Sequence, residues 1–113
     1  MIRGNEMGAV QIRNDVIGSI AALAAQEVEG VSGVWKGLSL LGLFGRSGVR
    51  VEAQESEAKI WIPLVVEYGV NLPHTAAMVQ DRVREAVEQM TQLNAVEVNV
   101  SIHQIKSKRS ATP

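Results

Sequence analysis

Apolar and polar residues recur with two different periods along this chain, and these periods predict its secondary-structure elements. Strict alternation predicts strands at residues 9–12, 48–53, 58–68 and 96–102. Spacings of three and four predict helices over about 14–29 and 73–93. The apolar stripes of the two helices are Ile17, Ile20, Ala21, Ala24 and Val28, and Ala76, Val79, Val83, Val87 and Met90. The predicted order is therefore β-α-β-β-α-β.

This order predicts an α+β fold, a two-layer sandwich with two helices on one face of a mostly antiparallel four-stranded sheet. Residues 54–57 are polar enough for a turn, so the two middle strands should form a hairpin. The inward face of the longer strand is predicted to carry the even-numbered residues from Ile60 to Tyr68. Pro63 has no N–H to donate, so this strand is expected at a sheet edge or bulged there.

The helix ends carry recognisable signals. Asn14 or Asp15 offers a capping oxygen to the first helix, and Gly30 suits the left-handed turn after it. Asn71 is expected to cap the second helix, and Pro73 is tolerated in its first turn. Glu27 stands near the negative end of the first helix, so we expect a basic residue beside it.

A chain of 113 residues has room for one core. We place a single domain at residues 9–105, between a flexible N-terminus at 1–8 and a basic flexible tail at 106–113. Residues 30–48 hold six glycines among large apolar residues and form a linker segment inside the domain. Nothing in the sequence resembles a signal peptide or an apolar run long enough to span a membrane.

The apolar linker segment has two interpretations. It is either a lid that packs on the core or an exposed site for a partner, because so large an apolar patch is unusual on a small domain. The candidate partner-binding residues are Trp35, Leu38, Leu40, Leu41, Leu43 and Phe44. A weak anion-binding patch is the second candidate site, and its residues are Lys106, Lys108 and Arg109.

Catalytic and cofactor chemistry finds little support in the composition. The chain has no cysteine, and neither His74 nor His103 has a partner at a spacing that defines a metal or nucleophile site. The glycines do not form a phosphate-binding loop. We therefore expect no enzymatic activity, no cofactor, no metal and no small-molecule substrate.

Nucleic-acid binding is a further hypothesis, because the same element order occurs in RNA-binding domains that stack bases on sheet aromatics. Trp61 and Tyr68 have opposite parity in their strand and should face opposite sides of the sheet. The net charge of -1 gives no general attraction to a polyanion. Nucleic-acid binding through the basic tail is therefore the weakest hypothesis.

Three short motifs, in order, carry a family resemblance. They are Glu27-Val28-Glu29-Gly30-Val31, Val66-Glu67-Tyr68-Gly69-Val70 followed by Pro73, and Val96-Glu97-Val98-Asn99-Val100. With these motifs the chain resembles the alkaline shock protein family of Gram-positive and related bacteria, from about residue 8 to 105. The apolar stretch from Leu38 to Phe44 and the proline at position 63 depart from the commoner pattern of that family.

The resemblance implies a non-enzymatic, cytoplasmic protein of the general and cell-envelope stress response. It implies a binding or scaffold module that a protein partner, such as an integral membrane protein, recruits to the inner face of the cell membrane. A regulatory subunit that docks on a cytosolic enzyme through residues 30–48 is the alternative. Self-association is also expected, because an edge strand and an apolar linker both favour contacts between copies.

Overall fold

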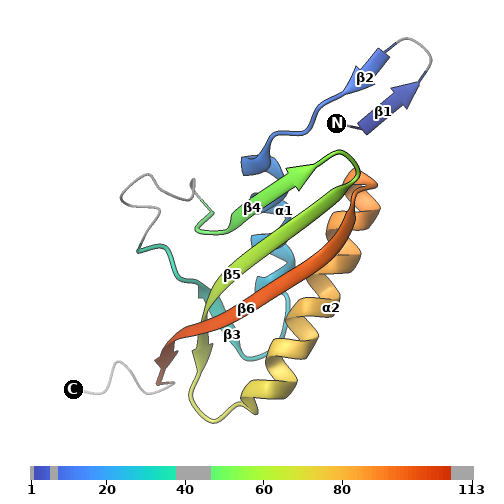
Figure 1. Ribbon diagram of the computed structural model, residues 1–113. Helices are drawn as coiled ribbons and strands as arrows, with labels where there is room; N and C mark the ends of the chain where they lie inside the picture. The colour runs from blue at the N-terminus through green and yellow to red at the C-terminus, as the bar shows by residue number, and fades with distance from the viewer. Residues whose placement is uncertain (1, 6–7, 38–46, 108–113) are drawn as a thin grey trace.

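The computed structural model describes residues 2–5, 8–37 and 47–107 and confirms the predicted α+β sandwich. Two helices lie on one face of a four-stranded sheet, and the sheet lies in front of both helices in Figure 1. The elements are β1 (Ile2–Asn5), β2 (Gly8–Val10), α1 (Asn14–Gln26), β3 (Val31–Val34), β4 (Arg50–Gln54), β5 (Glu57–Glu67), α2 (Leu72–Thr91) and β6 (Asn94–Lys106).

The long strand β5 is the centre of the sheet. On one side it pairs with β6 in parallel along its whole length, and α2 makes the crossover that parallel neighbours require. On the other side it has two shorter antiparallel neighbours. β4 pairs with residues 57–61 as the predicted hairpin, and β3 pairs with residues 64–66.

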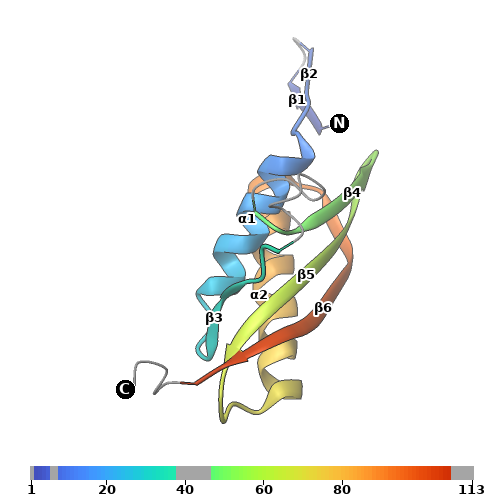
Figure 2. The same cartoon turned by 90° about the vertical axis from the view of Figure 1, so that its left-hand side faces the viewer.

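Two strands lie in different places from those that the sequence predicts. The strand expected at residues 9–12 is observed as β2, which pairs with β1 in a separate two-stranded sheet. Figure 2 shows this hairpin beyond the end of α1, away from the main sheet. The fourth strand of the main sheet is β3, which lies in the segment expected to be a linker. The sequence pattern did not predict β3, because the strand has only four residues and one of them is a glycine. Only Val31 and Val34 are buried, which is too few to give a clear alternation.

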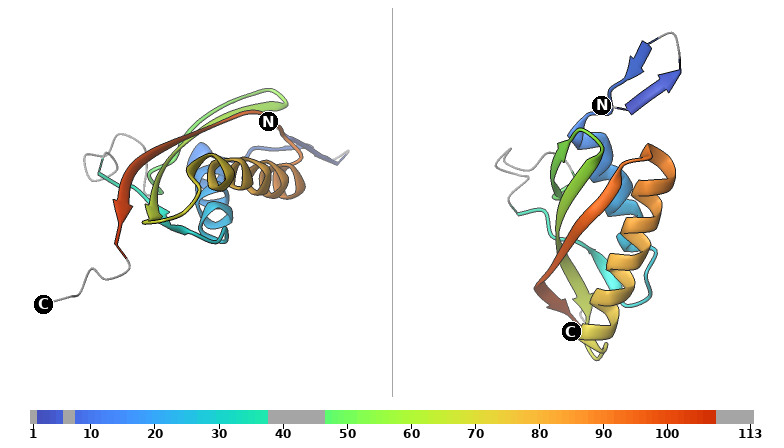
Figure 3. Two further views of the ribbon diagram at one scale, coloured as in Figure 1. Left: turned by 90° about the horizontal axis from the view of Figure 1, so that it is seen from below. Right: turned by 45° about the vertical axis from the view of Figure 1, so that its right-hand side comes forward.

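The covered face of the sheet forms an aliphatic core with the two helices. The view from below in Figure 3 shows both helices on the same side of the curved sheet. Ile60, Ile62, Leu64 and Val66 of β5 are fully buried, as the alternation predicts. Tyr68 was expected to continue this face, and that was wrong, because its side chain is 75% exposed. The strand ends at Glu67, so the alternation of side chains does not extend to Tyr68.

Of the two expectations for Pro63, a sheet edge was wrong, since β5 is central, whereas the ladder with β6 does have an irregularity just after it, between Leu64 and Val65. Pro63 lies between the part of β5 that pairs with β4 and the part that pairs with β3. Its carbonyl oxygen points to that side and accepts from the Trp35 N–H at 2.8 Å. The proline nitrogen faces the same gap, where no strand needs a donor from it.

Most signals at the helix ends are confirmed. Asn71 Oδ1 accepts from the His74 N–H at 3.0 Å and caps α2. Gly30 has the expected left-handed backbone, with φ +96, but it leads into β3, because α1 already ends at Gln26 with Glu27 as its cap. The expected basic neighbour of Glu27 is Arg82, at 2.7 Å. The expected cap of α1 was wrong. Arg13 precedes the helix without a side-chain cap, because the Asn14 side chain donates instead to the Val51 carbonyl of β4 at 3.2 Å.

Candidate binding site on the helix-free face of the sheet

The second face of the sheet carries aromatic and polar side chains, and no helix of the described ranges covers it (Figure 1). We call it the helix-free face. Its residues on β5 are the odd-numbered ones, Trp61, Pro63 and Val65, whose even-numbered neighbours are buried in the core. The parallel pairing places Asn99 beside Trp61 and Ser101 beside Pro63.

Trp35 reaches this face from the end of β3. Its N–H donates to Pro63, which fixes the backbone, and its indole ring stacks on the His103 imidazole with centroids 4.7 Å apart at 22°. Gly37 packs directly on the same indole, because a Cβ at that position would stand 2.3 Å from a ring carbon. A side chain at position 37 would therefore displace the tryptophan.

Trp61 forms a second aromatic wall on β5. The Arg50 guanidinium of β4 lies over its ring at 4.5 Å from the centroid, a cation–π arrangement. Arg50 also forms an ion pair with Glu52, which satisfies its charge locally. These contacts hold the indole of Trp61 on the face of the sheet rather than in solvent.

The two tryptophans border a hollow of about 140 Å³. Its other lining residues are Ile62, Pro63, Asn99, Val100, Ser101 and His103. An apolar cavity of about 150 Å³ is large enough to take benzene. The hollow therefore has the size and the walls for one aromatic or branched aliphatic group.

Polar groups stand at the rim of this hollow. Asn99 Nδ2 donates to Glu97 Oε2 at 2.9 Å and lies 3.5 Å from the Ile60 carbonyl oxygen, which it also reaches as a donor. The side chain of Ser101 is exposed next to it. An apolar centre with a polar rim is the usual anatomy of a protein-binding spot.

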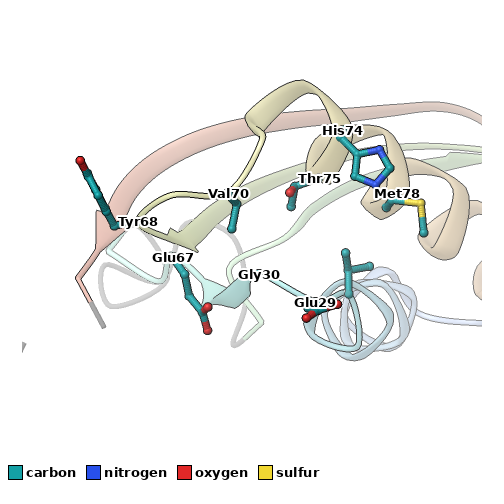
Figure 4. A pocket seen from close by; sticks show the side chains of 9 residues that line it. Glu29, Gly30, Glu67, Tyr68, Val70, His74, Thr75 and Met78 are labelled. Carbon is teal, nitrogen blue, oxygen red and sulfur yellow. The ribbon is translucent and has the colours of Figure 1, made fainter. Parts of the chain in front are cut away.

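A second, more polar pocket of about 320 Å³ lies where α1 ends and α2 begins (Figure 4). Glu29 and Glu67 contribute carboxylates, and His74 contributes an imidazole. Tyr68 points away from the other labelled side chains. In residues 11–37 and 47–107, no three acidic or histidine side chains are close enough to hold a metal ion. This pocket offers no defined ligand set.

Of the candidate site residues predicted from the sequence, the structure describes two, and the others lie outside the described ranges. Trp35 is half-buried on the helix-free face, and Lys106 is exposed at the end of β6. The other candidates, Leu38, Leu40, Leu41, Leu43, Phe44, Lys108 and Arg109, lie outside the described residues.

Sequence reasoning missed Trp61, Pro63 and His103 as parts of one site. Parity alone places Trp61 and Pro63 on one side of their strand. Trp61 and Tyr68 have opposite parity, so the pair gave no sign of a shared site. The residues that surround Trp61 in the site come from other elements.

None of the helices in the described ranges combines the length and the apolar character that crossing a membrane requires.

Comparison with known families decides the relationship. A model of the alkaline shock protein 23 family, described as having a cell envelope-related function, matches residues 3–107. The chain belongs to this family. The resemblance read from the three short motifs is therefore confirmed, and it places the chain in a family related to stress response and the cell envelope.

Two relatives illustrate the family. The uncharacterized protein YqhY of Bacillus subtilis (strain 168) is 36% identical over 103 residues, which cover 85% of this chain and 76% of YqhY. A protein named stress response regulator gls24 homolog, from Streptococcus pyogenes, is 32% identical over 108 residues. These cover 89% of this chain but only 60% of the streptococcal protein, which is therefore considerably longer than the shared region.

Solved structures show the same fold at low sequence identity. A variant of MamM-CTD superimposes with a TM-score of 0.53 at 16% identity, covering 83% of this chain and 99% of that one. A cadmium form of another MamM CTD variant gives the same TM-score of 0.53, at 16% identity. At these identities the likeness concerns the fold alone.

Proposed function

We propose that this protein is a non-enzymatic binding module of the cell-envelope stress response. It binds a protein partner through the hollow between Trp35 and Trp61. It acts in the cytoplasm and reaches the inner face of the cell membrane through that partner, for which an integral membrane protein is the leading candidate. Self-association and a scaffold role belong to the same proposal.

The observation that carries this proposal is the apolar hollow on a sheet face that no described helix covers. Tryptophan is among the residues that contribute most to protein interfaces, especially in small pockets with a polar rim. The family and the name of its streptococcal relative support the setting in stress response.

The packing of His103 supports a binding role for the helix-free face. Its imidazole lies flat on the Trp35 indole, with ring centroids 4.7 Å apart, and both residues line the hollow.

The remaining sequence candidates extend the same proposal. Trp35 is the described member of the apolar set, and Leu38, Leu40, Leu41, Leu43 and Phe44 follow it directly in the chain. We propose that they contribute to the same partner surface. Lys106, Lys108 and Arg109 are proposed as a weak anion-binding patch.

The test compares three full-length tagged variants, each expressed in the native host under alkaline or cell-wall stress. Trp61→Ala and Trp35→Ala remove the walls of the hollow, and Tyr68→Ala is the matched control, an exposed aromatic residue outside it. We expect each tryptophan variant to reduce the captured partner about tenfold or more, whereas Tyr68→Ala retains it. Quantitative mass spectrometry of the purified complexes gives the measurement.

Circular dichroism must show that the tryptophan variants remain folded, and fractionation must show the wild-type protein together with a membrane or envelope protein. The proposal fails if folded Trp61→Ala captures the same proteins as the wild type. A cytosolic enzyme as the partner lost from the variants would replace the envelope role with that of a regulatory subunit.

A further inference from the structure

The outer edge of β6 differs between its two halves. Near its start, side chains of α2 occupy the backbone groups that face away from β5. Glu88 Oε2 accepts from the Ala95 N–H at 3.0 Å, and Arg84 Nε donates to the Ala95 carbonyl at 3.2 Å. Gln80 Nε2 donates to the Val98 carbonyl at 3.1 Å. The helix thus closes this half of the edge.

Beyond Val98 the edge is open. Backbone groups of alternate residues point to the same side of a strand, so those of Val100 and Ile102 face outward as Val98 does. The Lys106 carbonyl accepts from the Tyr68 N–H, so Ile105 faces outward again after the irregularity near residue 103. No described strand pairs with this edge, and β6 extends away from α2 here (Figure 1).

The open half of the edge adjoins the hollow. Val100, Ser101 and His103 belong to both, because they line the hollow and lie on this part of β6. A strand added at the edge would lie beside them and would have alternate side chains on the helix-free face. One of these side chains could enter the hollow from its β6 side.

The charge on this half favours one chemistry for the added strand. Lys106 is charged and exposed at the end of β6, and the sequence after it adds Lys108 and Arg109 and no acidic residue. Glu67 is opposite Lys106 in the register, and the two side chains form no ion pair. The surplus of positive charge favours an acidic partner segment, chiefly through specificity and rate of association.

We propose that the partner binds by β-strand addition. An extended, acidic segment of the partner pairs with Val100–Ile105 of β6 and places one aromatic side chain in the hollow between Trp35 and Trp61. Backbone hydrogen bonds supply affinity and the hollow supplies selectivity. This inference rests on the proposed function but specifies a mode of binding that the function does not require.

The test selects phage-displayed random nine-residue peptides on the full-length protein. We expect enrichment of peptides with one aromatic residue flanked by Asp or Glu. Each selected peptide is then synthesised in two N-methylated forms. One form carries methyl groups on the backbone amides of the odd-numbered positions, and the other form carries them on the even-numbered positions. Methylation of the set that faces β6 should abolish binding, and methylation of the other set should leave the Kd within about twofold, because a strand bonds to its neighbour through every second residue.

A pair of variants tests the same edge from the side of the protein. Ile105→Pro removes an outward N–H at a position where an edge strand tolerates proline, and Ile105→Thr alters the side chain but retains the N–H. We expect Ile105→Pro to weaken the selected peptides roughly tenfold and Ile105→Thr much less. Amide exchange of β5 checks that the parallel pairing is retained in both.

The outcomes separate the two proposals. If aromatic peptides are enriched but bind equally well with either set of amides methylated, strand addition is wrong, and the hollow remains a binding site. A parallel selection on Trp61→Ala protein gives the background. If the selection on wild-type protein enriches aromatic residues no more than this background, the inference is also overturned. The proposed function fails independently, through unchanged partner capture by folded Trp61→Ala protein.

Discussion

The two faces of the central strand are built from different kinds of residue. On the covered face, Ile60, Ile62 and Leu64 are aliphatic and fully buried against the helices. On the helix-free face, Trp61 and Pro63 border an open hollow, and the residues around them come from β3, β4 and β6. Since the two sets alternate along the same strand, neighbouring positions serve different purposes.

The two faces contribute to different free energies: the covered face to that of folding, and the helix-free face to that of binding. Burial of aliphatic side chains stabilises the fold in proportion to the apolar area removed from water. The tryptophans bury part of their area within the chain and retain the rest for contact with another molecule. We therefore expect stability to depend on the covered face and recognition to depend on the helix-free face.

The largest expected effect comes from substituting two adjacent residues. Leu64→Ala should lower the free energy of unfolding by about 2–5 kcal/mol, because it opens a cavity in the core. Val65→Ala, which alters the opposite face one residue later, should cost less than about 1 kcal/mol. Urea unfolding monitored by circular dichroism measures both. Equal losses for the two variants would show that the faces do not divide in this way.

A smaller effect is expected at the start of α2. Asn71→Ala removes the side-chain oxygen that accepts from the His74 N–H and should cost about 1 kcal/mol. Asn71→Ser retains a capping oxygen and is the matched control. Thermal unfolding measures stability, and binding of a selected peptide measures recognition. Stability should fall while the Kd of the folded protein is unchanged, and a weakened Kd would couple the helix layer to the hollow.

The smallest expected effect concerns the ion pair between the helices. Glu27 and Arg82 pair at 2.7 Å, and both side chains are largely in contact with solvent. Exposed ion pairs contribute about 0.2–1 kcal/mol and weaken as salt is added. A double-mutant cycle with Glu27→Gln and Arg82→Gln, at low and high salt, measures the coupling. A coupling above that range, or one insensitive to salt, would show that the helix layer depends on this pair.

Periodicity in the sequence predicted the covered face well. The stripes of α1 and α2 and the even-numbered residues of β5 are local patterns, and burial imposes them directly. Met90 is the exception in the α2 stripe: that prediction was wrong, because its side chain is 69% exposed and Thr91 is buried there instead. The cap at Asn71 and the turn at Gly30 follow from single residue types and were also predicted. The three family motifs lie in these same regions.

The helix-free face could not be predicted in the same way. Trp35, Trp61 and His103 come from three segments, and the sheet topology alone brings them together. Periodicity carries no information on which strands are neighbours. Pro63 misled for the same reason: its missing donor indicates an unpaired position, but a central strand with two short neighbours also contains one.

The gap at Pro63 has a consequence for how this architecture tolerates change in length. Because β3 and β4 pair with separate parts of β5, each has its own register. The connection between them transmits no alignment from one to the other. Extra length between two chain ends is cheap in general, since doubling it costs only about 0.6 kcal/mol in closure entropy. Residues inserted between β3 and β4 would therefore leave both ladders intact, which makes this connection the natural place for new sequence to be acquired.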